Sequence, residues 1–294
     1  MLCESPVIIK QCSHPVSCGH CPGCRNRLIR DWQLRMSHEL AEYDYRALFV
    51  TLTYKNEEVP HGYSLSKRDV QLFIKRLRKY LSTKSVCAKY GIPYKTPIKY
   101  FIAGEYGPRT GRPHYHCIIL GLDSRHRKII FDAWGKSSYA YYDCKVINSN
   151  KALAYVAGYS SKKLGIRYSS LFTRRTGKIP PFQLVSLGFG KRFALRLPKG
   201  VTDTGTIRHG GSERLLPRYY RKILQIKPEV IGRAVETIIV KSARALTETF
   251  GINSRRADYE VRYNGSLMRR IRLEYNSRLR KQFNQWRGSV PALV

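Results

Sequence analysis

Acidic residues are scarce in this sequence. Its 294 residues include 20 Asp and Glu against 54 Lys and Arg, which gives a formal net charge of +34. A charge of this size favours a polyanionic partner, because only a partner with many negative charges neutralises it readily. Nucleic acid is therefore the first partner class that we expect.

Long apolar runs are also absent. No stretch approaches the ~18 consecutive apolar residues of a membrane-spanning helix, and the basic residues are spread along the chain instead of lying on one amphipathic helix. The opening MLCESPVIIKQCSHP lacks the long apolar core and the small-residue cleavage site of a secretory signal. We therefore expect no membrane partner and a reducing cytoplasm, which argues against disulfides.

Cysteines are concentrated near the start of the sequence, where five of the eight fall within the first 24 residues. The spacing C-x5-C-x2-C-x2-C suits a tetrahedral structural zinc site formed by Cys12, Cys18, Cys21 and Cys24. Spare ligands nearby are Cys3, His14 and His20. An iron–sulfur cluster and free thiols near a DNA-binding surface are the alternatives.

Composition divides the chain into three segments. Residues 1–43 hold the cysteines and a helical apolar pattern, and residues 44–194 carry alternating strand and helix signals. Residues 195–294 are basic, with helical patterns at 228–250 and 266–286. We therefore expect a central core between a cysteine-rich segment and a basic, mainly helical extension.

The central segment alternates between two kinds of periodicity. Strands are predicted at 47–54, 98–105, 114–122 and 139–147. Helices are predicted at 66–81, 125–134 and 150–165, the first with a capping-box pattern from Ser66 to Asp69. This order implies an α+β fold of the split βαβ kind, a mainly antiparallel sheet with helices on one face.

Two histidines, His114 and His116, begin the third predicted strand. Side chains at i and i+2 share one face of a strand, about 6.6 Å apart, so the imidazoles can converge on one metal ion. Glu105 closes the preceding strand, and a hairpin would return it beside them. This O/N set suits a divalent ion that keeps water or a phosphate oxygen in its other positions. Histidines that cap a core strand and a solvated glutamate are the alternatives.

Two tyrosines, Tyr155 and Tyr159, stand one helical turn apart in YVAGYSSKK, followed by Lys162 and Lys163. A phenolate is a competent nucleophile on phosphorus, and a nearby ammonium group or metal ion would stabilise its charge. An amphipathic helix that packs two aromatic side chains would show the same spacing. The tyrosine pair is therefore informative only together with the histidines.

In this combination and order the features resemble the HUH endonucleases. The likeness is greatest to the rolling-circle replication initiators of small single-stranded DNA phages, the microviruses of the gokushovirus branch. The segments that carry it are CGHCPGCRNRLIRDW (18–32), FVTLTY (49–54), GEYGPRTGRPHYHCIILG (104–121) and YVAGYSSKK (155–163). The resemblance implies that residues 44–194 form an HUH endonuclease core.

The activity that the resemblance implies is DNA nicking and joining at a viral origin. A tyrosine would form a 5′-phosphotyrosine bond and free a 3′-hydroxyl for a host polymerase, and the strand would be rejoined after one round. The implied ligands of Mg or Mn are Glu105, His114 and His116, and the implied catalytic residues are Tyr155, Tyr159, Lys162 and Lys163.

Partners and rivals follow from the same resemblance. The implied partners are single-stranded DNA, the viral origin and the host polymerase and helicase, in the cytoplasm of a host bacterium. Two other interpretations stay open from the sequence. One is a non-catalytic zinc and nucleic-acid binding protein with a packaging or regulatory role, and the other is an HUH transposase.

Overall fold

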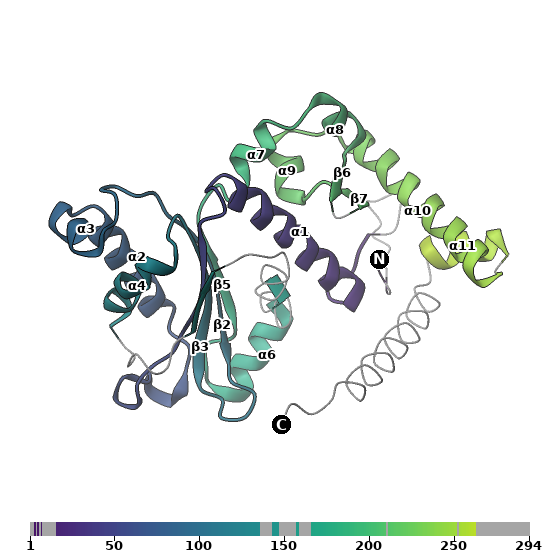
Figure 1. Ribbon diagram of the computed structural model, residues 1–294. Coiled ribbons are helices and arrows are strands. Elements are labelled where there is room, and N and C mark those ends of the chain that lie inside the picture. The colour runs from purple at the N-terminus through teal and green to yellow at the C-terminus, as the bar shows by residue number, and fades with distance from the viewer. Residues whose placement is uncertain are drawn as a thin grey trace, which may run out of the picture. The chain divides into compact units, whose positions relative to one another are not determined.

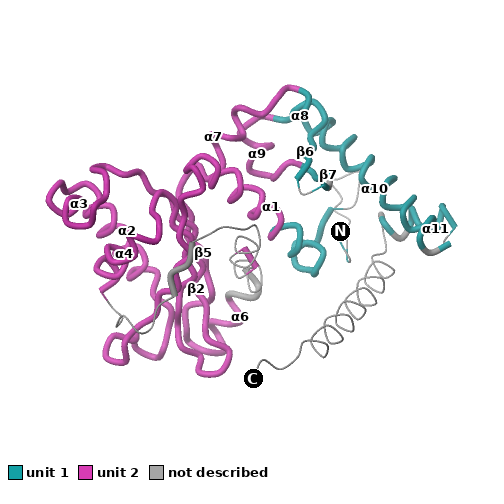
Figure 2. Tube along the Cα trace, viewed as in Figure 1, with its two compact units in different colours: residues 1–28, 200–215, 226–294 teal, residues 29–199, 216–225 magenta. Residues whose placement is uncertain are grey.

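The protein is described by a computed structural model, which groups the chain into two compact units (Figure 2). The residues that the structure describes are 3, 5, 7, 16–135, 143–146, 157–158, 166–209, 211–251 and 253–262. The larger unit comprises residues 29–199 and 216–225, and the smaller comprises residues 1–28, 200–215 and 226–294. The three segments inferred from composition stay a prediction.

The larger unit contains a five-stranded sheet and the helices around it (Figure 1). Its helices and strands are α1 (Pro22–Ala41, which begins in the smaller unit), β1 (Ala47–Leu52), α2 (Lys67–Leu81), α3 (Lys84–Tyr90), β2 (Lys99–Tyr106), β3 (Pro113–Leu120), α4 (Arg127–Trp134), β4 (Asp143–Val146), α6 (Ile166–Thr176), β5 (Phe182–Val185), α7 (Lys191–Leu195) and α9 (Arg218–Ile223). Short 3-10 helices lie at Asn56–Glu58, His61–Tyr63 and Ser124–His126.

Every strand pair in this sheet is antiparallel, in the order β4-β1-β3-β2-β5. Strand β3 lies at the centre, where His116 pairs with Thr51 of β1 on one side and with Ala103 of β2 on the other. The predicted α+β class with a mainly antiparallel sheet is confirmed.

Helices cover both faces of the sheet, not one face as predicted from the sequence (Figure 1). Apolar residues of α2 and α4, such as Phe73 and Ile130, pack on the face that carries Val50 and Ile119. Met36 and Leu40 of α1 pack on the opposite face, against Phe101 and its neighbours. The difference arises because the apolar stripe of α1 was assigned to the cysteine-rich segment. Burial on both faces also explains the unbroken apolar run Cys117–Leu120 in β3.

Helix α2 shows how local sequence sets an element. The Ser66 hydroxyl accepts a hydrogen bond from the Asp69 backbone N–H at 3.1 Å, which caps the helix as the sequence predicted. Apolar residues at helical spacing then form one buried face: Val70, Phe73, Ile74, Leu77 and Leu81. The predicted start and buried face of this helix are both confirmed.

The smaller unit is mainly helical among its described residues. Its elements are α8 (Lys199–Thr204), β6 (Thr206–His209), β7 (Ser212–Leu215), α10 (Pro228–Phe250) and α11 (Ser254–Arg262). Pro228 lies in the first turn of α10, and Gly251 caps its end with a φ of +63°. Leu246 of α10 packs against Ala257 and Val261 of α11. The helix predicted at 228–250 is confirmed, whereas the one predicted at 266–286 lies outside the described residues.

Tyr115, between the two histidines, points to the other face of the sheet and is fully buried. Its hydroxyl accepts a hydrogen bond from the Ser66 N–H at 2.8 Å and is hydrogen-bonded to the Tyr54 hydroxyl at 2.8 Å. Burial raises the pKa of Tyr115 to about 12, so the hydroxyl stays protonated. These bonds fix the strand that carries the histidines to the first turn of α2.

Replacing this tyrosine by phenylalanine should destabilise the larger unit. Tyr115→Phe leaves the Ser66 N–H and the Tyr54 hydroxyl without a bond that both make inside the protein, so we expect a loss of about 1–3 kcal/mol in the free energy of unfolding. Urea denaturation followed by tryptophan fluorescence measures this change. Tyr45→Phe, at a side chain that is 67% exposed, is the matched control, and we expect about 0.5 kcal/mol or less. Equal effects of the two substitutions would contradict the anchoring role.

Candidate metal centre and cysteine cluster

The hairpin of β2 and β3 brings Glu105, His114 and His116 together. Glu105 pairs directly with His114 across the hairpin, and His116 stands two residues further along the same face of β3. The turn between the strands closes through a hydrogen bond from the Gly107 N–H to the Arg112 carbonyl at 2.9 Å. The arrangement inferred from the sequence, with the glutamate returned beside both histidines, is what the structure shows.

The ligand atoms of these three residues converge on one point. The Glu105 Oε1 atom lies 3.1 Å from His114 Nε2 and 3.3 Å from His116 Nε2, and all three atoms lie within 4.8 Å of one another. The carboxylate thus bridges both imidazoles. One ion at this point would contact an oxygen and two nitrogens.

The second nitrogen of each imidazole has a partner on the outer side. His114 Nδ1 lies 3.2 Å from the Arg112 carbonyl oxygen, and His116 Nδ1 lies 3.2 Å from the Thr51 hydroxyl. Such outer partners hold a histidine ring so that its other nitrogen faces the ion. Sequence reasoning missed Thr51, although a hydroxyl inside the apolar strand Ala47–Leu52 is a signal that could have identified it.

Charge and exposure also favour a cation here. Burial would raise the Glu105 pKa, but hydrogen bonds from both histidines and their positive charge lower it to about 2, so the carboxylate is ionised. The side chains of Glu105 and His114 are 21% and 18% exposed, against 8% for His116. The centre is therefore accessible from the Glu105 and His114 side, and the O/N donor set fits a divalent cation with open positions.

The predicted catalytic residues Tyr155, Tyr159, Lys162 and Lys163 lie outside the described residues. Two residues between the tyrosines are described, Ala157 and Gly158, and both are helical. Ala157 is fully buried in the apolar cluster that contains Phe101 and Ile118. Ile118 lies on the same face of β3 as His116. The segment between the two tyrosines thus packs on the face of the sheet that carries the histidines.

The second group of possible metal ligands is formed by four cysteines in the smaller unit: Cys3, Cys18, Cys21 and Cys24. Their sulfur atoms lie within 4.8 Å of one another. Cys12, which the sequence suggested as the fourth ligand, lies outside the described residues. Cys3 is here the fourth member beside the three cysteines at the start of α1.

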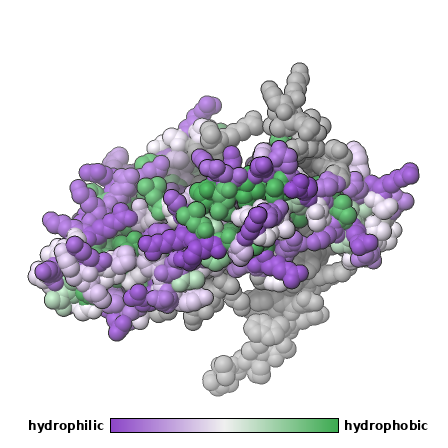
Figure 3. Space-filling view, turned by 90° about the horizontal axis from the view of Figure 1, so that it is seen from above, coloured by the Kyte–Doolittle hydropathy of each residue, from purple (hydrophilic) through white to green (hydrophobic). Residues whose placement is uncertain are grey.

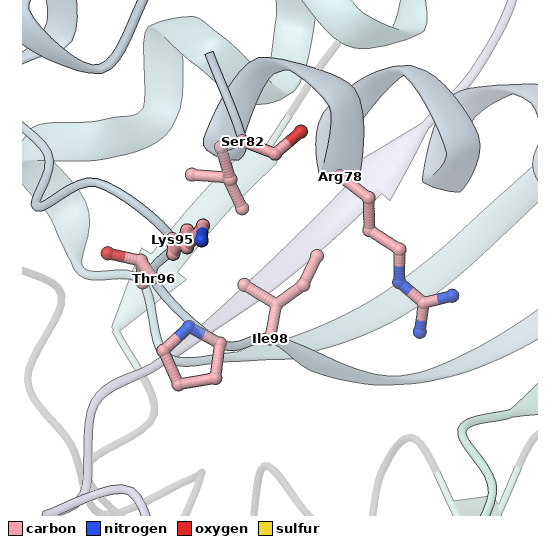
Figure 4. Close-up of a pocket in the computed structure, with 7 residues that line it drawn as sticks. Arg78, Ser82, Lys95, Thr96 and Ile98 are labelled. Atoms are coloured by element: carbon pink, nitrogen blue, oxygen red, sulfur yellow. The ribbon is translucent and has the colours of Figure 1, made fainter. Parts of the chain in front are cut away.

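A separate pocket lies between the end of α2 and the start of β2 (Figure 4). Its lining includes two cationic side chains, Arg78 and Lys95, and the hydroxyls of Ser82 and Thr96. Ile98 lies seven residues before Glu105, so an extended strand separates them by roughly 20 Å. The pocket is therefore not part of the histidine centre.

Hydrophilic side chains dominate the molecular face drawn in Figure 3, where they surround a smaller apolar area. This agrees with the large excess of Lys and Arg in the sequence. Among the helices that the structure describes, none combines the length and the apolar character needed to span a bilayer.

Comparisons with known proteins cover the central part of the chain. Residues 47–164 match the family model of the replication-associated protein ORF2. This range includes β1, β2 and β3 together with the segment of the tyrosine pair. No solved structure matches the chain.

Curated relatives come from three small phages. The chain is 30% identical to the replication-associated protein ORF2 of Spiroplasma virus 4 over 52% of this chain and 49% of the relative. It is 30% identical to the replication-associated protein VP4 of Bdellovibrio phage phiMH2K over 50% and 48%, and 25% identical to the replication-associated protein ORF4 of Chlamydia phage 1 over 74% and 55%. The chain thus spans about half the length of the curated relatives it matches. These matches confirm the resemblance drawn from the sequence, to replication-associated proteins of small single-stranded DNA phages.

Proposed function

We propose that this protein is a replication initiator that nicks and rejoins one DNA strand at a phage origin. The observation that carries the proposal is the convergence of Glu105 Oε1 with the Nε2 atoms of His114 and His116, whose Nδ1 atoms are held from outside. The relatives' names supply the process, DNA replication, and the centre supplies the chemistry. A strand of DNA is also the partner that the net charge of +34 favours.

The metal centre would act on the phosphate that is to be broken. Glu105, His114 and His116 would hold Mg or Mn, which when bound acts as a Lewis acid on a phosphate oxygen. The three protein ligands leave coordination positions for that oxygen and for water. The exposed sides of Glu105 and His114 are where unpaired DNA would enter.

A tyrosine would carry out the substitution at phosphorus. The phenolate oxygen of Tyr155 or Tyr159 forms a bond to phosphorus, the bond to the 3′ oxygen breaks, and that oxygen takes up a proton to become a 3′-hydroxyl. The tyrosine proton goes to solvent or to a neighbouring base. Lys162 or Lys163 would position the phosphate or the phenolate. Ala157, packed on the histidine face, supports this role for the segment between the tyrosines.

The phosphotyrosine ester conserves the broken phosphodiester bond for rejoining. A host polymerase would extend the free 3′-hydroxyl, with a host helicase opening the duplex. The second tyrosine would then cut the regenerated origin while the first is still occupied, and the new 3′-hydroxyl would attack the first ester to close the released circle. Two tyrosines one helical turn apart could in turn face the same phosphate.

The first test removes one metal ligand. His114→Ala should abolish cleavage of a single-stranded origin oligonucleotide and lower the affinity for Mn²⁺, because a nitrogen donor is lost from the centre. Binding of the oligonucleotide should stay close to the wild-type value, since Lys and Arg supply most phosphate contacts. His61→Ala, at an exposed histidine of a 3-10 helix, is the matched control. Cleavage by His114→Ala at the control's rate would contradict the proposal.

A second test addresses the outer hydrogen bond to the other histidine. Thr51→Val keeps the shape and branching of the side chain but removes the hydroxyl that holds His116 Nδ1. We expect Mn²⁺ affinity and cleavage rate to fall together by about 10–100-fold. Calorimetric titration with Mn²⁺ and a cleavage time course measure the two quantities. An unchanged affinity would show that Thr51 does not orient the ligand.

The tyrosine pair is tested by removing only the phenolic oxygens. Tyr155→Phe and Tyr159→Phe should each still form some 5′-linked protein–DNA adduct on a short origin strand, because either tyrosine can attack the phosphate. The double variant should form none while it remains folded by circular dichroism. Each single variant should fail to release closed circles, because a complete round needs a second cut while the first tyrosine is occupied.

Two results would overturn this assignment. An adduct formed by the double variant would place the nucleophile elsewhere in the chain. Normal circle release by both single variants would exclude the alternation of two tyrosines. Metal-independent DNA binding without any cleavage by the wild-type protein would instead favour a non-catalytic nucleic-acid binding protein.

A further inference from the structure

The four clustered cysteines come from two separate stretches of chain. Cys18, Cys21 and Cys24 lie around the start of α1, whereas Cys3 stands fifteen residues earlier. Two backbone hydrogen bonds of 2.9 Å between Val7 and Val16 form an antiparallel bridge and turn the chain back on itself. This reversal carries Cys3 to the other three cysteines.

The spacing of the sulfur atoms matches a single tetrahedral metal ion. Cys18 Sγ lies 4.0 Å from Cys24 Sγ, and Cys21 Sγ lies 3.8 Å from Cys3 Sγ. Four sulfurs placed tetrahedrally at the usual Zn–S distance of about 2.3 Å stand about 3.8 Å apart. A disulfide would require about 2.05 Å. The sulfurs of an iron–sulfur cluster bind different iron atoms and stand further apart, so one ion fits this site better.

Backbone N–H groups point at three of the sulfurs. The Cys18 N–H donates to Cys3 Sγ at 3.3 Å, the Cys21 N–H to Cys18 Sγ at 3.3 Å, and the Cys24 N–H to Cys21 Sγ at 3.4 Å. Such donors stabilise negative charge on sulfur. The first turn of α1 contains no acidic residue, so the thiolates would be the negative groups beside the positive end of the helix dipole. This environment suits metal-bound thiolates.

We propose that Cys3, Cys18, Cys21 and Cys24 bind one structural Zn²⁺ ion and that Cys12 is not a ligand. Four thiolates complete the coordination of zinc and leave no open position, so the site is structural and takes no part in cleavage. It would fasten the first residues of the chain to the start of α1. The site is independent of the proposed nicking activity, because it shares no residue with the histidine centre.

The main experiment compares two cysteine variants of the full chain, Cys3→Ser and Cys12→Ser. Zinc content is measured by elemental analysis, and affinity by competition with a chromophoric chelator. We expect one zinc per chain in the wild-type protein and in Cys12→Ser. In Cys3→Ser the affinity should fall by at least about 100-fold, since losing a ligand costs more than losing an outer partner. The variant His114→Ala should keep its zinc, which separates this site from the metal centre of the proposed function.

A second measurement needs no substitution and covers the case in which Cys3→Ser fails to fold. Wild-type protein is treated with N-ethylmaleimide with and without a zinc chelator, and the labelled cysteines are identified by mass spectrometry. Zinc should protect Cys3, Cys18, Cys21 and Cys24, and the chelator should expose them. Cys12 should be labelled in both samples.

Three outcomes would overturn the proposal. Loss of zinc in Cys12→Ser with retention in Cys3→Ser would exchange the roles of these two cysteines. Labelling of Cys3 in the zinc-bound protein would remove it from the ligand set. A folded wild-type protein that takes up no zinc would exclude the site altogether.

Discussion

The antiparallel register of β2, β3 and β1 is the constraint on which the metal centre depends. Glu105 meets His114, and Thr51 meets His116, only in this register. Side chains alternate between the two faces of a strand, so a shift of one residue would send both histidines to the face occupied by α2 and α4. The buried run that follows His116 fixes the register, because its apolar side chains pack on both faces of the sheet. Core packing therefore sets the geometry of the ligands.

The two faces of the sheet divide the work at β3. On one face Tyr115 is bonded to the start of α2, which holds the strand in place. On the other face the imidazoles of His114 and His116 are held by the Arg112 carbonyl and the Thr51 hydroxyl. Their free nitrogens and the Glu105 carboxylate are thereby preorganised, and a bound cation would replace existing hydrogen bonds instead of reorienting side chains. A centre of this kind suits repeated cutting and joining, because its ligands need not move between steps.

Much of this arrangement could be predicted from the sequence, because it rests on local patterns. The cap at Ser66 and the β2–β3 hairpin follow from short-range signals, and the structure contains both. The second layer of helices was not predictable in the same way, since the stripe of α1 does not indicate which surface it covers. Strand β5 is four residues long and pairs with β2 across a long stretch of chain. Cys3 was named only as a spare ligand because its approach depends on the Val7–Val16 bridge, whose partners have no distinctive spacing.

The central claim is that Glu105, His114 and His116 form one divalent metal site at the point where DNA is cut. Pulsed electron paramagnetic resonance of the Mn²⁺-loaded protein tests it directly, because imidazole nitrogens bound to the ion produce resolved hyperfine couplings. The account predicts couplings from two histidine nitrogens, of which one disappears in His116→Ala, and a further coupling to phosphorus when a single-stranded origin oligonucleotide is added. A bound Mn²⁺ ion without histidine nitrogen couplings, or with unchanged couplings in His116→Ala, would contradict the account.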